Sequence, residues 1–99
     1  MAKLLANING GNGNYPSATG INFQGGERTL AFQGTFSGTT NISASYDDGT
    51  TFITLTDSDG SALNITADSI VNIAVGTQVK IRFDVTGASG TNDIDVYVA

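Results

Sequence analysis

The chain has 99 residues, the length of one domain with one modest hydrophobic core. It contains no cysteine and no histidine, which excludes disulfides, thiolate sites and imidazole bases or ligands. Nine acidic and four basic residues give a net charge of −5, which disfavours nucleic acid as a partner. Most familiar active sites are thereby excluded, and we expect a protein that is not an enzyme and has no cofactor.

The residue types favour β-structure. Apolar residues make up 39% of the sequence, whereas strong helix formers are scarce and never recur at helical spacing. The opening Met1-Ala2-Lys3-Leu4-Leu5 becomes polar too soon for a secretory leader, and no apolar run is long enough for a membrane helix. We therefore expect a soluble protein that is made in a cytosol and has no membrane partner.

Residues 1–27 are rich in Gly and Asn, which favour turns. This composition predicts an extended N-terminal arm over residues 1–27, followed by a separate domain over residues 28–99. Two interpretations of the arm are open. It is either a flexible terminus that adds one strand to a sheet edge, or a segment that becomes ordered against a neighbouring subunit.

From residue 28 onward, apolar side chains recur at every second position, the period of a strand with one buried face. The predicted strands include residues 30–36, 41–46, 63–66, 79–85 and 93–98. Turn signals fall between them at Ser37-Gly38, Asp48-Gly49, Asp59-Gly60, Val75-Gly76 and Ser89-Gly90. This rhythm predicts an all-β fold, a small antiparallel β-sandwich of the jelly-roll or immunoglobulin-like type.

The stretch SYDDGTTF, residues 45–52, predicts a hairpin turn. Asp48-Gly49 suits the centre of a type I′ turn, and nearby hydroxyls can bond the turn backbone. The expected cross-strand pairs are Tyr46 with Thr51, Ala44 with Ile53 and Ile42 with Leu55. The spacing of Ser45, Asp47, Gly49, Thr51 and Phe52 also resembles the Asp-box of sialidase-like propellers, a structural hairpin away from their active site. We interpret the stretch as a structural turn motif of Ser45, Asp47, Asp48, Gly49 and Thr51.

The acidic residues match no catalytic or metal-binding pattern. Asp57-Ser58-Asp59-Gly60 departs from a calcium loop because the glycine comes too early and no Glu follows. Asp84, Asp93 and Asp95 are expected on the solvated face of the last two strands, with Phe83 opposite either Val96 or Ile94. A hydrolase using Asp84 and Asp95 is a minor alternative, because a sandwich with short turns offers little concave surface. We expect no catalytic residue, cofactor or metal ligand.

Residues 36–98 are similar in pattern to small β-sandwich virion accessory proteins of tailed bacteriophages. The resemblance lies in GTFSGTT, YDDGTTF, IVNI, VKIRFDV and the final IDVYV, at residues 34–40, 46–52, 70–73, 79–85 and 94–98. It implies a non-enzymatic capsid decoration or cement protein, or a head-fibre type, located in the virion. The implied partner is the major capsid protein or another virion protein, in a homo-oligomeric or lattice-bound state.

Several apolar and aromatic side chains are candidate partner contacts: Leu4, Leu5, Ile8, Tyr15, Phe52 and Tyr97. Phe52 is expected on the outward face, where it is either covered by the second sheet or the arm, or available to a partner. The alternative function is a carbohydrate- or receptor-binding module of a tail or head fibre, in which Tyr46, Phe52 or Tyr97 would stack on sugars.

Overall fold

The computed structural model describes residues 2–99 and contains β-strands and no helix over that range. The strands are β1 (Lys3–Ile8), β2 (Gly13–Tyr15), β3 (Ile21–Phe23), β4 (Gly26–Thr35), β5 (Thr39–Ser45), β6 (Ile53–Thr54), β7 (Ser69–Val75), β8 (Val79–Thr86) and β9 (Asp93–Val98). The all-β prediction is confirmed.

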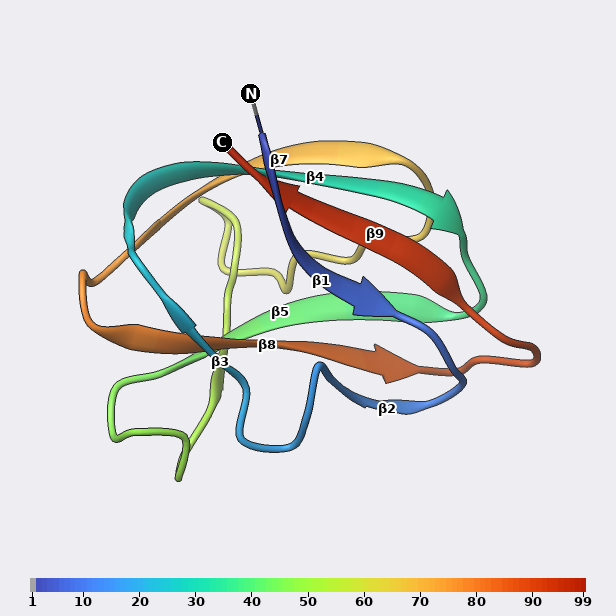
Figure 1. Cartoon of the computed structure of the whole chain (residues 1–99), viewed down its shortest axis with the longest axis horizontal. Helices are drawn as coiled ribbons and strands as arrows, with labels where there is room; N and C mark the ends of the chain where they lie inside the picture. Colours follow the sequence, from blue (N-terminus) through green and yellow to red (C-terminus); the bar gives the residue numbers. More distant parts are fainter. Residues whose placement is uncertain (1) are drawn as a thin grey trace.

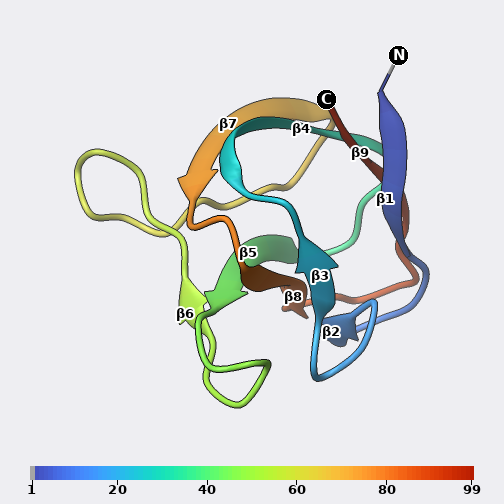
Figure 2. The same ribbon diagram turned by 60° about the vertical axis from the view of Figure 1, so that its left-hand side comes forward.

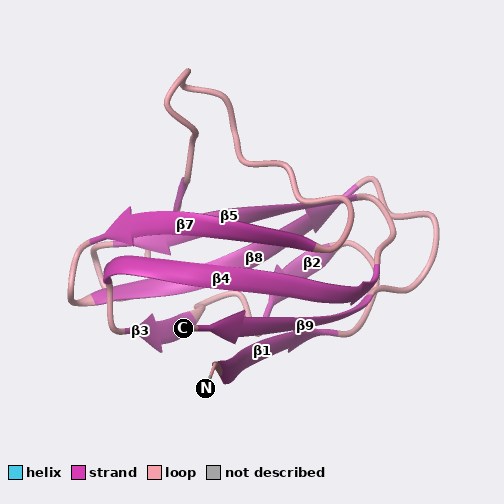
Figure 3. Cartoon of the chain, turned by 90° about the horizontal axis from the view of Figure 1, so that it is seen from above, coloured by secondary structure: helices cyan, strands magenta, loops and turns pink. Residues whose placement is uncertain are grey.

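The strands form two antiparallel sheets that are stacked in two layers (Figure 1). One sheet has the order β1-β9-β4-β7, and its four strands lie side by side in Figure 3. The other sheet has the order β2-β8-β5-β6, and β3 pairs with the same edge of β8 as β2. The predicted small antiparallel β-sandwich is therefore confirmed.

The strand pairs are nested in the sequence. β1 pairs with β9, β2 and β3 pair with β8, β4 pairs with β7, and β5 pairs with β6. The chain is thus a long antiparallel ribbon that rolls up, so that β4 also pairs with β9 and β5 with β8. This is the jelly-roll arrangement, one of the two predicted types, and Figure 2 shows the curvature that it produces.

The period-two pattern of the sequence produces the core. On β8, the buried residues Val79, Ile81, Phe83 and Val85 alternate with the partly exposed Lys80, Arg82 and Asp84, as predicted. Phe32 of β4 meets Phe83 between the two sheets, with ring centroids 5.6 Å apart and ring planes at 85°. This edge-to-face pair joins the two layers at the centre of the sandwich.

The N-terminal segment differs from the predicted arm, because it is built into both sheets. β1 pairs with β9 along its length, and β2 and β3 pair with β8. Ile8 is fully buried and Phe23 is 5% exposed, so both belong to the core. The physical reason is that Gly and Asn occupy the turns between three short strands, whose apolar residues complete the core. Residues 28–99 alone would leave edges of β8 and β9 open.

Two predictions are wrong, the pairing of the last two strands and the strand at residues 63–66. β8 and β9 lie in different sheets, so Phe83 is opposite neither Val96 nor Ile94 in a ladder. Each strand instead pairs with strands from earlier in the chain, because the ribbon closes between its ends. Residues 63–66 form no strand, although Ile65 is buried as expected and makes one bridge to Thr40.

Three connections between the sheets are joined at one end of the sandwich by Asn92, which is 1% exposed. Its Oδ1 accepts a hydrogen bond from the Ser37 N–H at 2.7 Å. Its Nδ2 and its backbone N–H both donate to the Gly10 carbonyl, at 3.0 and 2.8 Å. One buried amide therefore connects segments that are more than fifty residues apart in the chain.

Candidate functional site

The turn motif forms a hydrogen-bonded loop between β5 and β6. The Ser45 hydroxyl donates to Asp47 Oδ1 at 2.7 Å and accepts from the Gly49 N–H at 2.9 Å. Asp47 Oδ1 also accepts from the Thr51 N–H at 2.8 Å. Asp48 and Gly49 have φ values of 61° and 89°, which are the values of the two central residues of a type I′ turn. The structure therefore brings all five motif residues into one loop.

The loop is wider than the predicted two-residue hairpin. β5 ends at Ser45 and β6 begins at Ile53, so Tyr46 and Thr51 are not ladder partners, although Ala44 pairs with Ile53 as expected. The hydrogen bond from the Thr51 backbone, followed by that from the Ser45 hydroxyl, holds the pKa of Asp47 below its usual value. These hydrogen bonds join the Asp47 carboxylate to the start and the end of the loop.

Phe52 is half-buried beneath groups of its own chain. The guanidinium carbon of Arg82 lies 4.0 Å from the ring centroid, within the range of a cation–π contact. Gly20 approaches the ring so closely that an added Cβ would lie 3.0 Å from Phe52 Cζ. Arg82 is held over the ring by Asp84, with Nε 2.6 Å from Oδ1. Of the two alternatives for Phe52, the structure has the covered one, and the N-terminal segment supplies part of the cover.

The acidic residues of the two sheets do not converge on one site. Asp84 accepts from the Ser43 hydroxyl at 2.7 Å and pairs with Arg82, whereas Asp95 accepts from Asn7 Nδ2 at 2.9 Å. Asp84 and Asp95 alternate with buried residues on β8 and β9, so they point outward from opposite sheets. Within residues 2–99, no three acidic side chains lie close enough to hold a metal ion.

The strongest candidate for a binding surface is the outer edge of β7. β7 is the last strand of its sheet and pairs only with β4. The Ala99 N–H donates to the Thr29 carbonyl, so the backbone N–H and C=O groups of Thr29 point toward β9. Asn72 is the cross-strand partner of Thr29 on β7. Because these two residues are a pair without mutual hydrogen bonds, the N–H and C=O groups of Asn72 point away from β4. By alternation, Ile70, Asn72 and Ala74 direct their N–H and C=O groups to the open edge.

The β7 edge also lacks the features that usually protect an edge strand. Its sequence SIVNIAV contains no charge and no proline, and the Ile70 side chain is 76% exposed. The other edges are different: β1 carries Lys3 and a bulge between Leu4 and Ala6, β6 has two residues, and β2 and β3 have three each. Among the described strands, β7 is therefore the long and unprotected edge.

The predicted contact residues are scattered and mostly covered. Leu4 is 52% exposed, whereas Leu5, Tyr15 and Tyr97 are half-buried. Ile8 is fully buried and cannot touch a partner, because β1 is a strand of the sandwich and its inward side chains fill the core.

Sequence reasoning missed two of the most exposed apolar side chains, Ile70 and Ile53, and it named the equally exposed Tyr46 only as a sugar contact of the alternative function. Tyr46 was expected on the core face of a strand, but β5 ends one residue before it. Ile53 shares its expected face with Ala44, yet it is 63% exposed because β6 lies at the edge of its sheet. A signal for Ile70 was present, since alternation from the buried Ile73 places it outward.

No known protein family, curated protein or solved structure is significantly similar to this chain. The described residues include no helix that could cross a membrane.

Proposed function

We propose that this protein is a non-enzymatic accessory protein of a tailed-bacteriophage virion, and that it decorates or cements the capsid by binding the major capsid protein. The proposal rests on the resemblance of residues 36–98 and on the open edge of β7. The jelly roll agrees with it by analogy alone, since this fold occurs in viral capsid and lectin domains. Under this proposal, the protein is located in the virion after synthesis in the host cytoplasm.

The observation that carries the proposal is the unprotected β7 edge. Such an edge accepts an extended segment of another protein as an additional strand, and backbone hydrogen bonds then supply the affinity. Ile70 stands beside this edge and would become covered by the outward side chains of the added strand. The capsid protein is expected to contribute that strand from an exposed loop or terminus.

The size of this edge predicts how the protein would bind. Three outward-facing residues offer six backbone groups, and each hydrogen bond contributes about 1 kcal/mol net. Association itself costs about 4–15 kcal/mol, so one β7 edge gives only weak binding to a single subunit. Tight binding requires further contacts or several linked copies, and an assembled lattice or a homo-oligomer provides both.

The proposal is tested by co-sedimentation with capsids assembled from the major capsid protein of the same genome. We expect the wild-type protein to sediment with assembled capsids and to bind free subunits more weakly. Ile70→Lys should abolish co-sedimentation, because a charge beside the open edge opposes strand addition. Ile53→Lys is the matched control, since it makes the same change at an exposed isoleucine of another edge strand.

Two results would overturn the proposal. The first is a protein that is absent from purified virions and does not sediment with capsids. The second is co-sedimentation of Ile70→Lys at the same level as Ile53→Lys and the wild-type protein, which would show that β7 is not part of the interface.

A further inference from the structure

We infer that a second surface, a groove between β3, the turn-motif loop and the connection from β7 to β8, binds an uncharged saccharide. This inference is independent of the β7 edge and of any capsid partner. The groove is open to solvent, has a volume of about 610 Å³, and combines one exposed aromatic ring with three side-chain amides. Its volume lies within the range of about 300–1,000 Å³ that small-ligand sites have.

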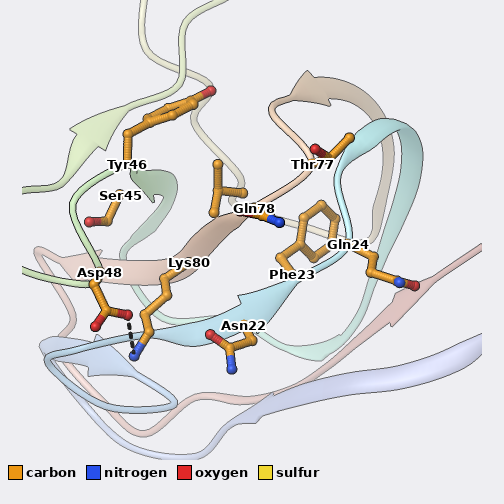
Figure 4. A pocket seen from close by; sticks show the side chains of 10 residues that line it. Asn22, Phe23, Gln24, Ser45, Tyr46, Asp48, Thr77, Gln78 and Lys80 are labelled. Atoms are coloured by element: carbon orange, nitrogen blue, oxygen red, sulfur yellow. Dashed lines mark ion pairs between the residues drawn. The ribbon is translucent and has the colours of Figure 1, made fainter.

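Three segments that are distant in the sequence form the groove (Figure 4). Asn22 and Gln24 come from β3 and the residue after it, Tyr46 comes from the turn-motif loop, and Gln78 comes from the β7–β8 connection. Phe23, which is 5% exposed, contributes apolar surface to the lining. Figure 4 shows the side chains of Asn22, Gln24, Tyr46 and Gln78 on the segments that line this groove.

The Tyr46 ring is exposed and yet held in position. Tyr46 is 63% exposed, and its Oη accepts a hydrogen bond from the Gly76 N–H at 3.2 Å. The ring lies against Gly76, since a Cβ there would be 3.0 Å from Tyr46 Cε2. A ring fixed at its hydroxyl end and along one side offers an ordered apolar surface, on which the C–H groups of a sugar ring can stack.

The groove amides have no partners within the described residues. Asn22, Gln24 and Gln78 are all exposed, and none of their side chains makes a hydrogen bond to another part of residues 2–99. Some other amides of the described residues are engaged: Asn7 donates to Asp93, Asp95 and the Ile94 carbonyl, and Asn41 donates to the Leu63 carbonyl and to Asn64. A side-chain amide both donates and accepts, as a sugar hydroxyl does, so a groove lined by three such amides and one aromatic ring suits a polyol.

The charges in the groove favour an uncharged ligand. Its one cation is Lys80, which pairs with Asp48 at a distance of 3.6 Å between Nζ and Oδ1. An anionic sugar or phosphate would have to compete with this carboxylate for the ammonium group, and the net charge of −5 would also repel it. Neutral hexoses and N-acetylhexosamines avoid both costs, and they are the saccharides that we expect the groove to bind.

The test is an NMR titration of the full-length protein with oligosaccharides of glucose, galactose, mannose and N-acetylglucosamine. We expect the backbone amide signals of Tyr46, Thr77 and Gln78 to shift and saturate with at least one of these sugars. Tyr46→Ala should weaken that binding about tenfold. Gly76→Ala should also weaken it, because the new methyl group displaces the ring while the backbone stays in an ordinary conformation.

Tyr97→Ala is the matched control, because it removes a tyrosine from β9 and leaves the groove intact. Tyr46→Ala removes a mostly exposed side chain, so its spectrum should remain that of a folded protein. The inference is overturned if no tested saccharide shifts the groove signals, or if Tyr46→Ala and Tyr97→Ala bind equally well. Capsid binding of the β7 variants is measured separately, so either idea can fail alone.

Discussion

Replacing Ala74 by proline tests the open edge of β7 most directly. Ala74 is exposed and directs its N–H away from β4, so Ala74→Pro removes no hydrogen bond of the sandwich. Proline is tolerated at such an edge position, and Ile73 before it is already extended, as a residue preceding proline prefers. We expect a loss of stability of no more than about 1 kcal/mol.

Ala31→Pro makes the same substitution on the neighbouring strand β4 of the same sheet. Ala31 pairs with Tyr97 and, by alternation from Thr29, directs its N–H toward β9. Proline there leaves the Tyr97 carbonyl without its donor, which costs about 1–3 kcal/mol, and its ring also intrudes on the ladder. We expect a total loss of about 3 kcal/mol or more, which lowers the unfolding temperature of a domain of this size by about 12 °C or more.

Thermal unfolding followed by circular dichroism compares the two variants, and co-sedimentation with capsids then tests the folded one. Ala74→Pro should remain folded and lose capsid binding, because its ring replaces an N–H that an added strand needs. If Ala74→Pro unfolds as readily as Ala31→Pro, the assignment of the open edge is wrong. If it remains folded and still binds capsids, the capsid protein does not add a strand to β7.

Three further predictions concern the folded state. The pKa of Asp47 is lowered in the folded state, so its carboxylate contributes stability above the unfolded pKa of about 3.9, and this contribution disappears as the pH falls through the folded pKa. Asp47→Asn should therefore make the unfolding temperature fall less steeply with decreasing pH at the acid end. An unchanged acid dependence would contradict this. Asn92→Ala should cost about 2–3 kcal/mol, seen as an unfolding temperature about 8–24 °C lower, because the Ser37 N–H loses its partner and the Gly10 carbonyl keeps only the backbone N–H of residue 92. A shift of only one or two degrees would refute this junction. Phe83→Ala should cost about 3–5 kcal/mol, and the urea midpoint should fall with little change in slope; a small loss would show that the ring pair with Phe32 is not central to the core.

The strands that sequence analysis located best are those whose alternation is long and uninterrupted. β8 and β9 show this, because each inward residue from Val79 to Val85 and from Ile94 to Val98 is apolar and each residue between them is polar or aromatic. β2 and β3 were hidden because three residues are too few to show a period among Gly and Asn. Their assignment to the core follows only from their pairing with β8.

The candidate binding surfaces were less accessible to sequence analysis. IVNIAV reads as a generally apolar strand, and its exposure at Ile70 depends on β7 being the last strand of its sheet. The groove combines Asn22, Tyr46 and Gln78, which no local pattern connects. Asn92, which joins three connections, follows a short turn and carries no local sign of burial.

On the long strands such as β8 and β9, the order of residues by itself determined which side chains face inward, because the two-residue period of a strand is local and each residue type has its own preference for water or for the core. Only the tertiary structure decided which strands are neighbours and which edge stays open. Backbone N–H and C=O groups are the same at every residue other than proline, so the choice of partner strands depends on how the whole ribbon buries its apolar face.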